Sequence, residues 1–145
     1  MRRLLAAFAA VVVLAGCREV RVNQVRSGTT AALGPREVAV IRDRKILEAI
    51  GVSAPVDFRK EFVVVLLMGP HSQTGYSQVV EAIRANSDRV RIVAFERPPL
   101  DGGEPAPKEY RTYTLWIVPN SVYRSGSKVE VVSPSGEAIA STTLR

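Results

Sequence analysis

Apolar and polar residues alternate along most of the chain from residue 36 onward, and this two-residue period is typical of β-strands. Within 89–97, Val90 and Ile92 fall on one face, whereas Val93 and Phe95 fall on the other. The alternation predicts a domain dominated by short strands. Strands are expected at 36–41, 62–68, 76–85, 89–97, 111–118, 128–132 and 137–141.

Two of these strands carry most of the apolar residues. Residues 62–68 form an uninterrupted apolar run rich in β-branched side chains, which predicts a strand buried on both faces. In 111–118, Tyr113 and Leu115 lie on the face opposite to Trp116. We therefore expect Trp116 to be part of the core and not a platform for a ligand.

One segment has the period of a helix instead. In 42–50, Ile46, Leu47 and Ile50 fall on one helical face, and Gly51 follows as a stop signal. The pattern predicts a single short helix before the first long strand.

Polar or Pro/Gly-rich segments separate the predicted strands. Residues 86–88 and 133–136 are expected to be turns, and 98–107 (PPLDGGEPAP) is expected to be an irregular loop. Such a loop is a favoured place for contact with a partner, although a passive surface loop fits the composition equally well. The elements together predict an α+β, mainly β fold, either an antiparallel sandwich or a partly open barrel with one short helix.

The N-terminal segment has the features of a bacterial lipoprotein signal. Arg2 and Arg3 precede an apolar run at 4–15, which is shorter than the roughly 20 residues that a membrane span needs. The run ends in Leu14-Ala15-Gly16-Cys17, a lipobox whose cysteine is the acceptor of the lipid. A plain secretory signal with an accidental cysteine, or an uncleaved anchor, is the alternative.

This segment sets the predicted domain organisation. We expect a signal peptide at 1–16, a lipidated tether at 17–35 and a single mainly β domain at 36–145. Cys17 would hold the protein on the extracytoplasmic side of the cell envelope. Because Arg18 rather than an aspartate follows the cysteine, the outer membrane is expected if the cell has two membranes.

The scarcity of cysteine and histidine limits the disulfides and metal sites that the protein can form. Cys17 is the only cysteine, so its acylation leaves no disulfide, and His71 is the only histidine. We therefore expect no metal and no cofactor. The formal net charge is +6, but basic and acidic residues are interleaved, so a nucleic-acid partner is not expected.

The sequence also predicts that the protein is not an enzyme. It contains no nucleophile elbow and no phosphate-binding glycine loop, and Ser72 next to His71 is more typical of a turn than of a catalytic dyad. An enzyme built from scattered carboxylates needs two of them in one cleft, and no spacing selects a pair. The candidates are Glu81, Glu96, Asp101, Glu104 and Glu109.

One stretch resembles a known lipoprotein family. Residues 56–65 (VDFRKEFVVV), then Gly69, then 74–77 (TGYS) are similar to the C-terminal domain of the PrcB-type lipoproteins, a family named for its association with a protease complex, and the resemblance extends over about 56–119. The chain departs from that pattern at Thr74, where the family has a glycine, and at 114–116 (TLW), where it has Pro-Tyr. The resemblance implies a non-catalytic lipoprotein domain associated with a protease.

A second resemblance is confined to two loops. Residues 73–76 (QTGY) and 100–103 (LDGG) are similar to loops of chagasin-type inhibitors of papain-like cysteine proteases. In those inhibitors, loops at one end of a β-sandwich plug the protease cleft. The Arg-Pro-Trp of their third loop has no match in order here. Gly75 as a plain turn glycine and Tyr76 as a half-buried aromatic is the alternative interpretation.

These observations predict a membrane-anchored, non-catalytic protein-binding or assembly module. Its expected partner is an envelope or secreted protein, with a protease as one candidate, and the alternative function is inhibition of cysteine proteases through Thr74–Tyr76. Inhibition requires 72–76 and 98–107 to lie at the same end of the fold, flanking an exposed ridge. The predicted recognition edge consists of Thr74, Gly75, Tyr76, Gly102 and Gly103.

Overall fold

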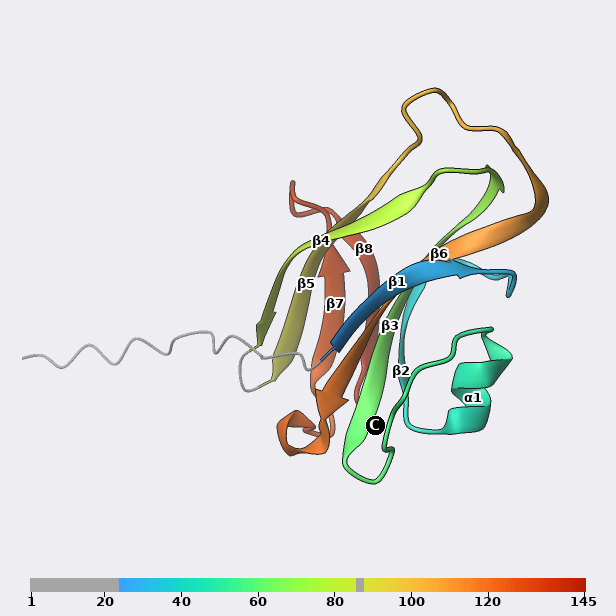
Figure 1. The fold of residues 1–145 in the computed structure, drawn as a ribbon. Coiled ribbons are helices and arrows are strands. Elements are labelled where there is room, and N and C mark those ends of the chain that lie inside the picture. Colours follow the sequence, from blue (N-terminus) through green and yellow to red (C-terminus); the bar gives the residue numbers. More distant parts are fainter. Residues whose placement is uncertain (1–23, 86–87) are drawn as a thin grey trace, which may run out of the picture.

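Two four-stranded β-sheets pack face to face in the computed structural model, which describes residues 24–85 and 88–145 (Figure 1). The first sheet has the order β1-β6-β3-β2 and the second the order β4-β5-β7-β8. The mainly β fold with one short helix is confirmed, and of the two architectures considered it is the sandwich. The elements are β1 (Gln24–Thr30), β2 (Glu37–Ile41), α1 (Arg44–Ala49), β3 (Glu61–Gln73), β4 (Ser77–Ala85), β5 (Arg89–Arg97), β6 (Pro105–Pro119), the 3₁₀ turn η1 (Asn120–Val122), β7 (Lys128–Val132) and β8 (Ala138–Thr143).

One pairing departs from the expected antiparallel arrangement, because β5 and β7 are parallel. Strand β6 runs the length of the first sheet and ends at Pro119, and the chain crosses to the second sheet through η1. It enters β7 from the same end at which β5 begins, with Arg89 beside Lys128. Long-range connectivity, and not local sequence, therefore decides the direction of β7.

The N-terminal boundary of the domain differs from the expectation. The sequence predicts a tether up to residue 35, but Gln24–Thr30 forms the edge strand β1, which pairs with β6 from Gln24 beside Ile117 to Thr30 beside Arg111. The small residues of this strand are stabilised by the ladder with β6 and not by an apolar face of their own. Cys17 and the predicted signal peptide lie outside the described residues. Among those described, no helix has the length and hydropathy of a membrane span.

The loop expected at 98–107 is also shorter than predicted, since β6 begins at Pro105. Proline is tolerated there because this end of β6 pairs irregularly with β3 and carries few ladder hydrogen bonds. Strand β3 also differs from its expected bounds, because it continues past Gly69 and Pro70 to Gln73 instead of ending at residue 68. The other predicted strands are found close to their expected bounds.

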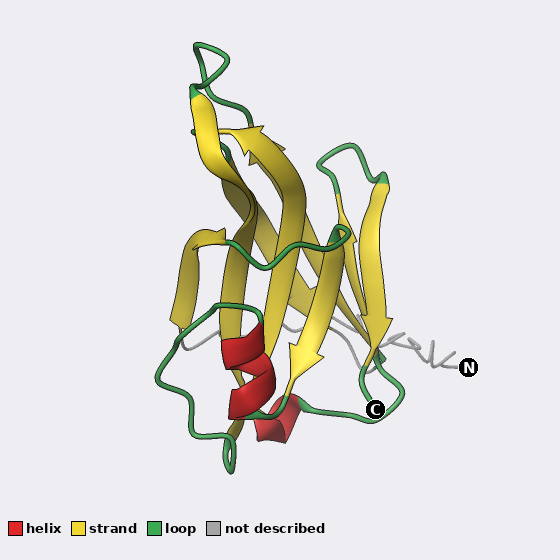
Figure 2. Ribbon diagram, turned by 90° about the vertical axis from the view of Figure 1, so that its right-hand side faces the viewer, coloured by secondary structure: helices red, strands yellow, loops and turns green. Residues whose placement is uncertain are grey.

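Two apolar cores stabilise the sandwich, one on each face of the first sheet. Between the sheets, Trp116 and Phe62 pack against Ile92 of β5. On the outer face of the first sheet, Leu115 packs against Leu47 of α1, which covers this face (Figure 2). The predicted burial of 62–68 on both faces and the core position of Trp116 are thus confirmed.

The helix is short, and its ends follow local signals. Asp43 caps its N-terminus, with Oδ1 accepting hydrogen bonds from the backbone N–H groups of Lys45 at 2.7 Å and Ile46 at 3.4 Å. Gly51, at φ +72°, follows the last turn. Between these ends, Leu47 is the buried residue that fixes the helix to the second core.

Candidate functional site

A projecting arm is the most prominent feature of the surface, and it consists of residues 71–76 and 98–110. Strands β3 and β6 are 13 and 15 residues long, whereas the other strands have 5 to 9. Their extra length overhangs the second sheet, where His71 still lies beside Tyr110 and Gln73 beside Pro105. The loop between β5 and β6 lies at the end of this overhang (Figure 1).

Hydrogen bonds join the two loops of the arm into one unit. The backbone N–H of Thr74 donates to the carbonyl of Glu104 at 2.8 Å, and the N–H of Glu104 donates to Thr74 Oγ1 at 3.2 Å. Tyr110 Oη donates to the carbonyl of Gln73 at 2.6 Å. The turn at 74–76 and the loop at 98–104 therefore hold each other in place.

Two glycines are required for this close approach. Gly103 has φ +71°, and a Cβ there would lie 2.3 Å from the carbonyl oxygen of Thr74. Gly75 has φ +95°, and its Cβ would lie 2.7 Å from Cβ of Pro99. Both the backbone conformation and the lack of space exclude a side chain at either position.

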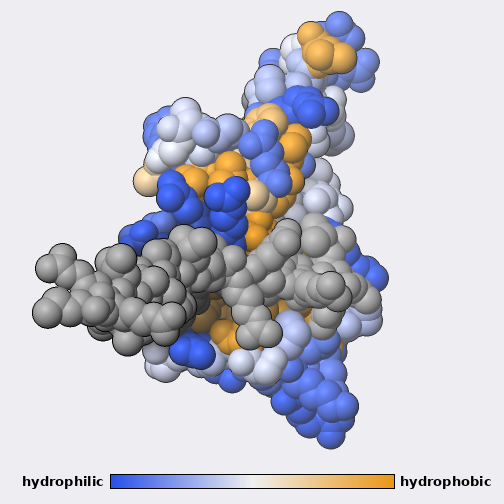
Figure 3. Space-filling model, turned by 90° about the vertical axis from the view of Figure 1, so that its left-hand side faces the viewer, coloured by the Kyte–Doolittle hydropathy of each residue, from blue (hydrophilic) through white to orange (hydrophobic). Residues whose placement is uncertain are grey.

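The tip of the arm presents an apolar side chain to solvent. Leu100 is 98% exposed. Two prolines precede it, and exposed Asp101 and Gly102 follow it. Figure 3 shows this apolar tip standing clear of the body of the molecule. Since Leu100 adds nothing to either core, its apolar character has no role in folding that the structure accounts for.

A polar cluster fills the space between the sheets at the base of the arm. His71 Nε2 lies 2.6 Å from Glu96 Oε2, and Thr112 Oγ1 donates to the same carboxylate oxygen at 2.6 Å. Gln78 Nε2 donates to the carbonyl of Thr112 at 2.9 Å. Tyr76 stacks on the imidazole of His71 at a centroid distance of 3.8 Å. The cluster thus ties the base of the arm to β4, β5 and β6.

The predicted recognition edge is only partly assembled at the tip. Gly103 lies against the carbonyl oxygen of Thr74, and Gly75 lies against Pro99. Gly102 follows Leu100 by two residues in the exposed tip. Tyr76 instead faces the base, where it is half-buried against His71. The predicted edge therefore divides into a loop pair near the tip and an aromatic residue that supports the arm from below.

The pairing of His71 with Glu96 was not predicted from the sequence. A signal for the inward position of Glu96 alone was present, because Glu96 shares its strand face with Val90 and Ile92, and Ile92 packs into the core between the sheets. The other carboxylates considered for chemistry are all exposed, namely Glu81, Asp101, Glu104 and Glu109. Residues 24–85 and 88–145 contain no group of three or more His, Cys, Asp or Glu able to hold a metal ion.

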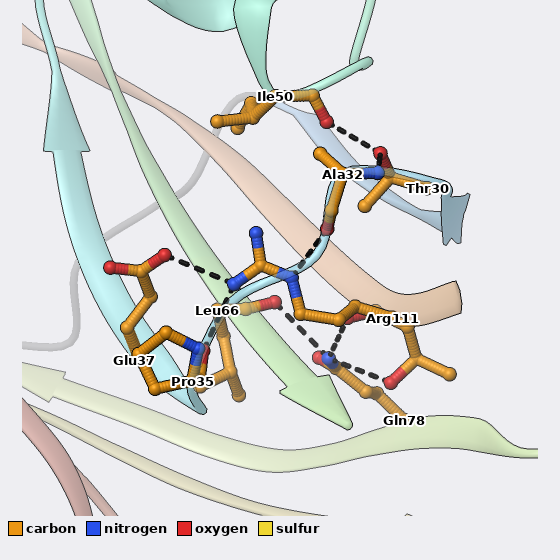
Figure 4. A network of polar contacts seen from close by, with 9 residues as sticks. Thr30, Ala32, Pro35, Glu37, Ile50, Leu66, Gln78 and Arg111 are labelled. Carbon is orange, nitrogen blue, oxygen red and sulfur yellow. Dashed lines mark hydrogen bonds and ion pairs between the residues drawn. The ribbon is translucent and has the colours of Figure 1, made fainter. Parts of the chain in front are cut away.

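Below the arm, a buried arginine fixes the segment that connects β1 to β2 (Figure 4). Arg111 is 2% exposed, and its Nε donates to the carbonyl of Ala32 at 2.7 Å. Its Nη1 donates to the carbonyl of Pro35 at 2.9 Å and lies 3.1 Å from Glu37 Oε1. Sequence reasoning did not single out Arg111, because an arginine at the start of a strand is ordinarily solvated.

No protein-family model matches the chain, and searches of curated proteins and of solved structures found no match.

Proposed function

We propose that the protein is an exported, lipid-anchored binding module without catalytic activity, which presents its arm to an envelope or secreted protein. The lipobox ending at Cys17 supports the anchoring, and the resemblance to PrcB-type lipoproteins supports an assembly role beside a protease. The observation that carries the proposal is the 98% exposure of Leu100 at the tip of an internally bonded arm.

The geometry of the arm favours binding for an energetic reason. An apolar side chain that enters a pocket contributes most when the loop carrying it is already ordered, since little conformational entropy is then lost on association. The bonds between Thr74 and Glu104 and the packing of Gly75 on Pro99 give the arm that order before any partner arrives.

The direction of β1 supports an orientation in which the arm points away from the proposed anchor. Gln24 pairs with Ile117, and Thr30 pairs with Arg111, so the chain enters the sheet at the end opposite to the arm. A domain held through Cys17 would thus point its arm away from the membrane, toward soluble or neighbouring proteins.

Leu100→Asp tests the proposal. We expect at least about a tenfold loss in the amount of partner protein that co-purifies after cross-linking in native membranes, because a charge replaces the apolar tip. Quantitative mass spectrometry of the captured proteins is the measurement. Val122→Asp is the matched control, since Val122 is 44% exposed and lies in η1, past the other end of β6.

Unchanged capture by Leu100→Asp, with circular dichroism confirming its fold, would show that the arm tip is not the contact. An equal loss in the Val122→Asp control would show a general effect of added charge and would also overturn the assignment.

Inhibition of cysteine proteases is a second candidate, favoured by the position of the two loops. Residues 72–76 and 98–104 lie at the same end of the fold and are bonded to each other, which is one of the conditions for inhibition. We expect an inhibitor to slow the hydrolysis of a fluorogenic peptide by papain in a concentration-dependent way, and Leu100→Asp to weaken that effect. Undiminished papain activity at micromolar protein would remove this candidate.

A further inference from the structure

The two sheets differ in what covers their outer faces. The first sheet has apolar cores on both sides, because α1 and residues 52–56 cover its outer face. The outer face of the second sheet has no such cover among the described elements. It nevertheless carries an apolar patch, here called the outer-face band, which consists of Val79, Ala82, Val93, Phe95 and Val132.

Strand register joins these residues into one continuous surface. Val79 lies beside Phe95, and Ala82 lies beside Val93, which in turn lies beside Val132. None of the five packs in the two core clusters described above. Val132 is buried at 6% exposure, whereas the other four are half-buried and form the accessible part of the band. Figure 3 shows apolar surface on this side of the molecule, below the projecting tip. A solvated sheet face is normally polar, so a band of this kind is unusual for a face that contacts only water.

Arginines border the band on both sides along the strands. Arg84 and Arg91 stand opposite each other on the same sheet face, an arrangement of like charges that disfavours strand pairing. Both are exposed, and no described carboxylate forms an ion pair with either. At the other side, exposed Arg97 follows Phe95 by two residues on the same face.

A carboxylate beside these arginines, that of Glu130, does not relieve the charge. Glu130 lies beside Arg91 in the register of β5 and β7. Its oxygens contact other cations, Arg89 at 3.3 Å and Lys128 at 3.6 Å. The cations of Arg84 and Arg91 are thus left facing outward at the border of an apolar surface.

We propose that the outer-face band binds a segment of the partner protein in which apolar side chains are flanked by aspartates or glutamates. This inference rests on the proposed function and adds the chemistry of the partner to it. Apolar burial on Val93 and Phe95 supplies contact area, and carboxylates of the segment pair with the bordering arginines. A second copy of this chain fits less well, because it would bring the same cations together.

Two labelled peptides test the inference by fluorescence anisotropy with the full-length protein. Both contain the apolar core Leu-Val-Phe-Val-Leu, and paired aspartates flank it in one peptide, whereas paired lysines flank it in the other. We expect the aspartate peptide to bind at least about tenfold more tightly. The double variant Arg84→Glu/Arg91→Glu, whose changes are exposed and do not touch the cores, should reverse that preference.

Arg36→Glu/Arg124→Glu is the control, because both arginines are exposed, lie outside the second sheet and give the same change in net charge. Phe95→Gln should weaken the binding of both peptides by a similar factor, since it alters the apolar part of the band that both of them contact. Equal binding of the two peptides, or an equal effect of the control variant, would overturn the inference. A concentration-dependent dimer in sedimentation that Phe95→Gln abolishes would assign the band to a second copy and overturn it as well.

The peptide titration leaves the arm tip untouched, so it separates this inference from the proposed function. If Leu100→Asp loses partner capture and the two peptides bind equally, the arm remains the proposed contact with the partner, and the outer-face band is rejected as a binding site. Selective binding of the aspartate peptide together with normal capture by Leu100→Asp would reject the arm as the contact.

Discussion

Trp116→Ala is expected to lower the free energy of unfolding by about 3 to 5 kcal/mol. Trp116 is 1% exposed at the centre of the core between the sheets, where it packs with Phe62 and Ile92. Truncation would leave a cavity that two hydrogen-bonded sheets cannot collapse to fill. Urea denaturation followed by circular dichroism measures the loss, with exposed Val122→Ala as a control that should change stability by less than about 0.5 kcal/mol.

Trp116→Phe should lower the free energy of unfolding by much less, about 1 to 2 kcal/mol, because it has two effects of opposite sign. Phenylalanine loses part of the indole volume, but it also removes the Nε1–H, which finds no hydrogen-bond partner among the described residues although it is buried. If the phenylalanine variant were as unstable as the alanine variant, the indole nitrogen would have to be satisfied, and the packing described for this core would be wrong.

Arg111→Met should produce the next largest loss, about 2 to 4 kcal/mol. Methionine retains much of the apolar stem but removes the donors to the carbonyls of Ala32 and Pro35, which hold the connection between β1 and β2. The ion pair with Glu37 adds little to this figure, since that carboxylate is 45% exposed and can be solvated.

Arg111→Lys separates the roles of charge and shape. Lysine keeps the charge but lacks the planar fork that reaches both carbonyls, so its stability should lie between those of the methionine variant and the native protein. The free energies of unfolding of the Arg111→Met and Arg111→Lys variants are measured by the same urea denaturation, with exposed Arg124→Met as the control. A loss below about 1 kcal/mol for Arg111→Met would mean that water replaces the guanidinium without cost.

The assignment of side chains to the two faces of each strand is the part of the fold that the sequence predicted best. The faces of β5 and β6 are as expected, with Ile92 and Trp116 between the sheets and Leu115 on the outer side. The uninterrupted apolar run of β3 likewise predicted burial on both faces. These predictions succeed because side-chain alternation is a local property of an extended chain.

The failures share a different cause, which is dependence on residues far away in the sequence. Strand β1 has no apolar pattern of its own and exists because β6 offers a partner. The parallel pairing of β5 with β7 follows from the path of the chain through η1. The junction of Thr74 with Glu104 spans 30 positions, and that of His71 with Glu96 spans 25, so no local spacing could predict either.

Strand β6 links the arm to the strand through which the chain enters the sheet. If the protein is anchored through Cys17 and a partner pulls on the arm, the tension passes from β1 to β6 across the seven residue pairs from Gln24 to Thr30. The load then acts along these antiparallel strands, so their hydrogen bonds would be sheared together instead of being peeled one after another. The domain would thereby act as a mechanical coupling between a membrane and whatever the arm holds.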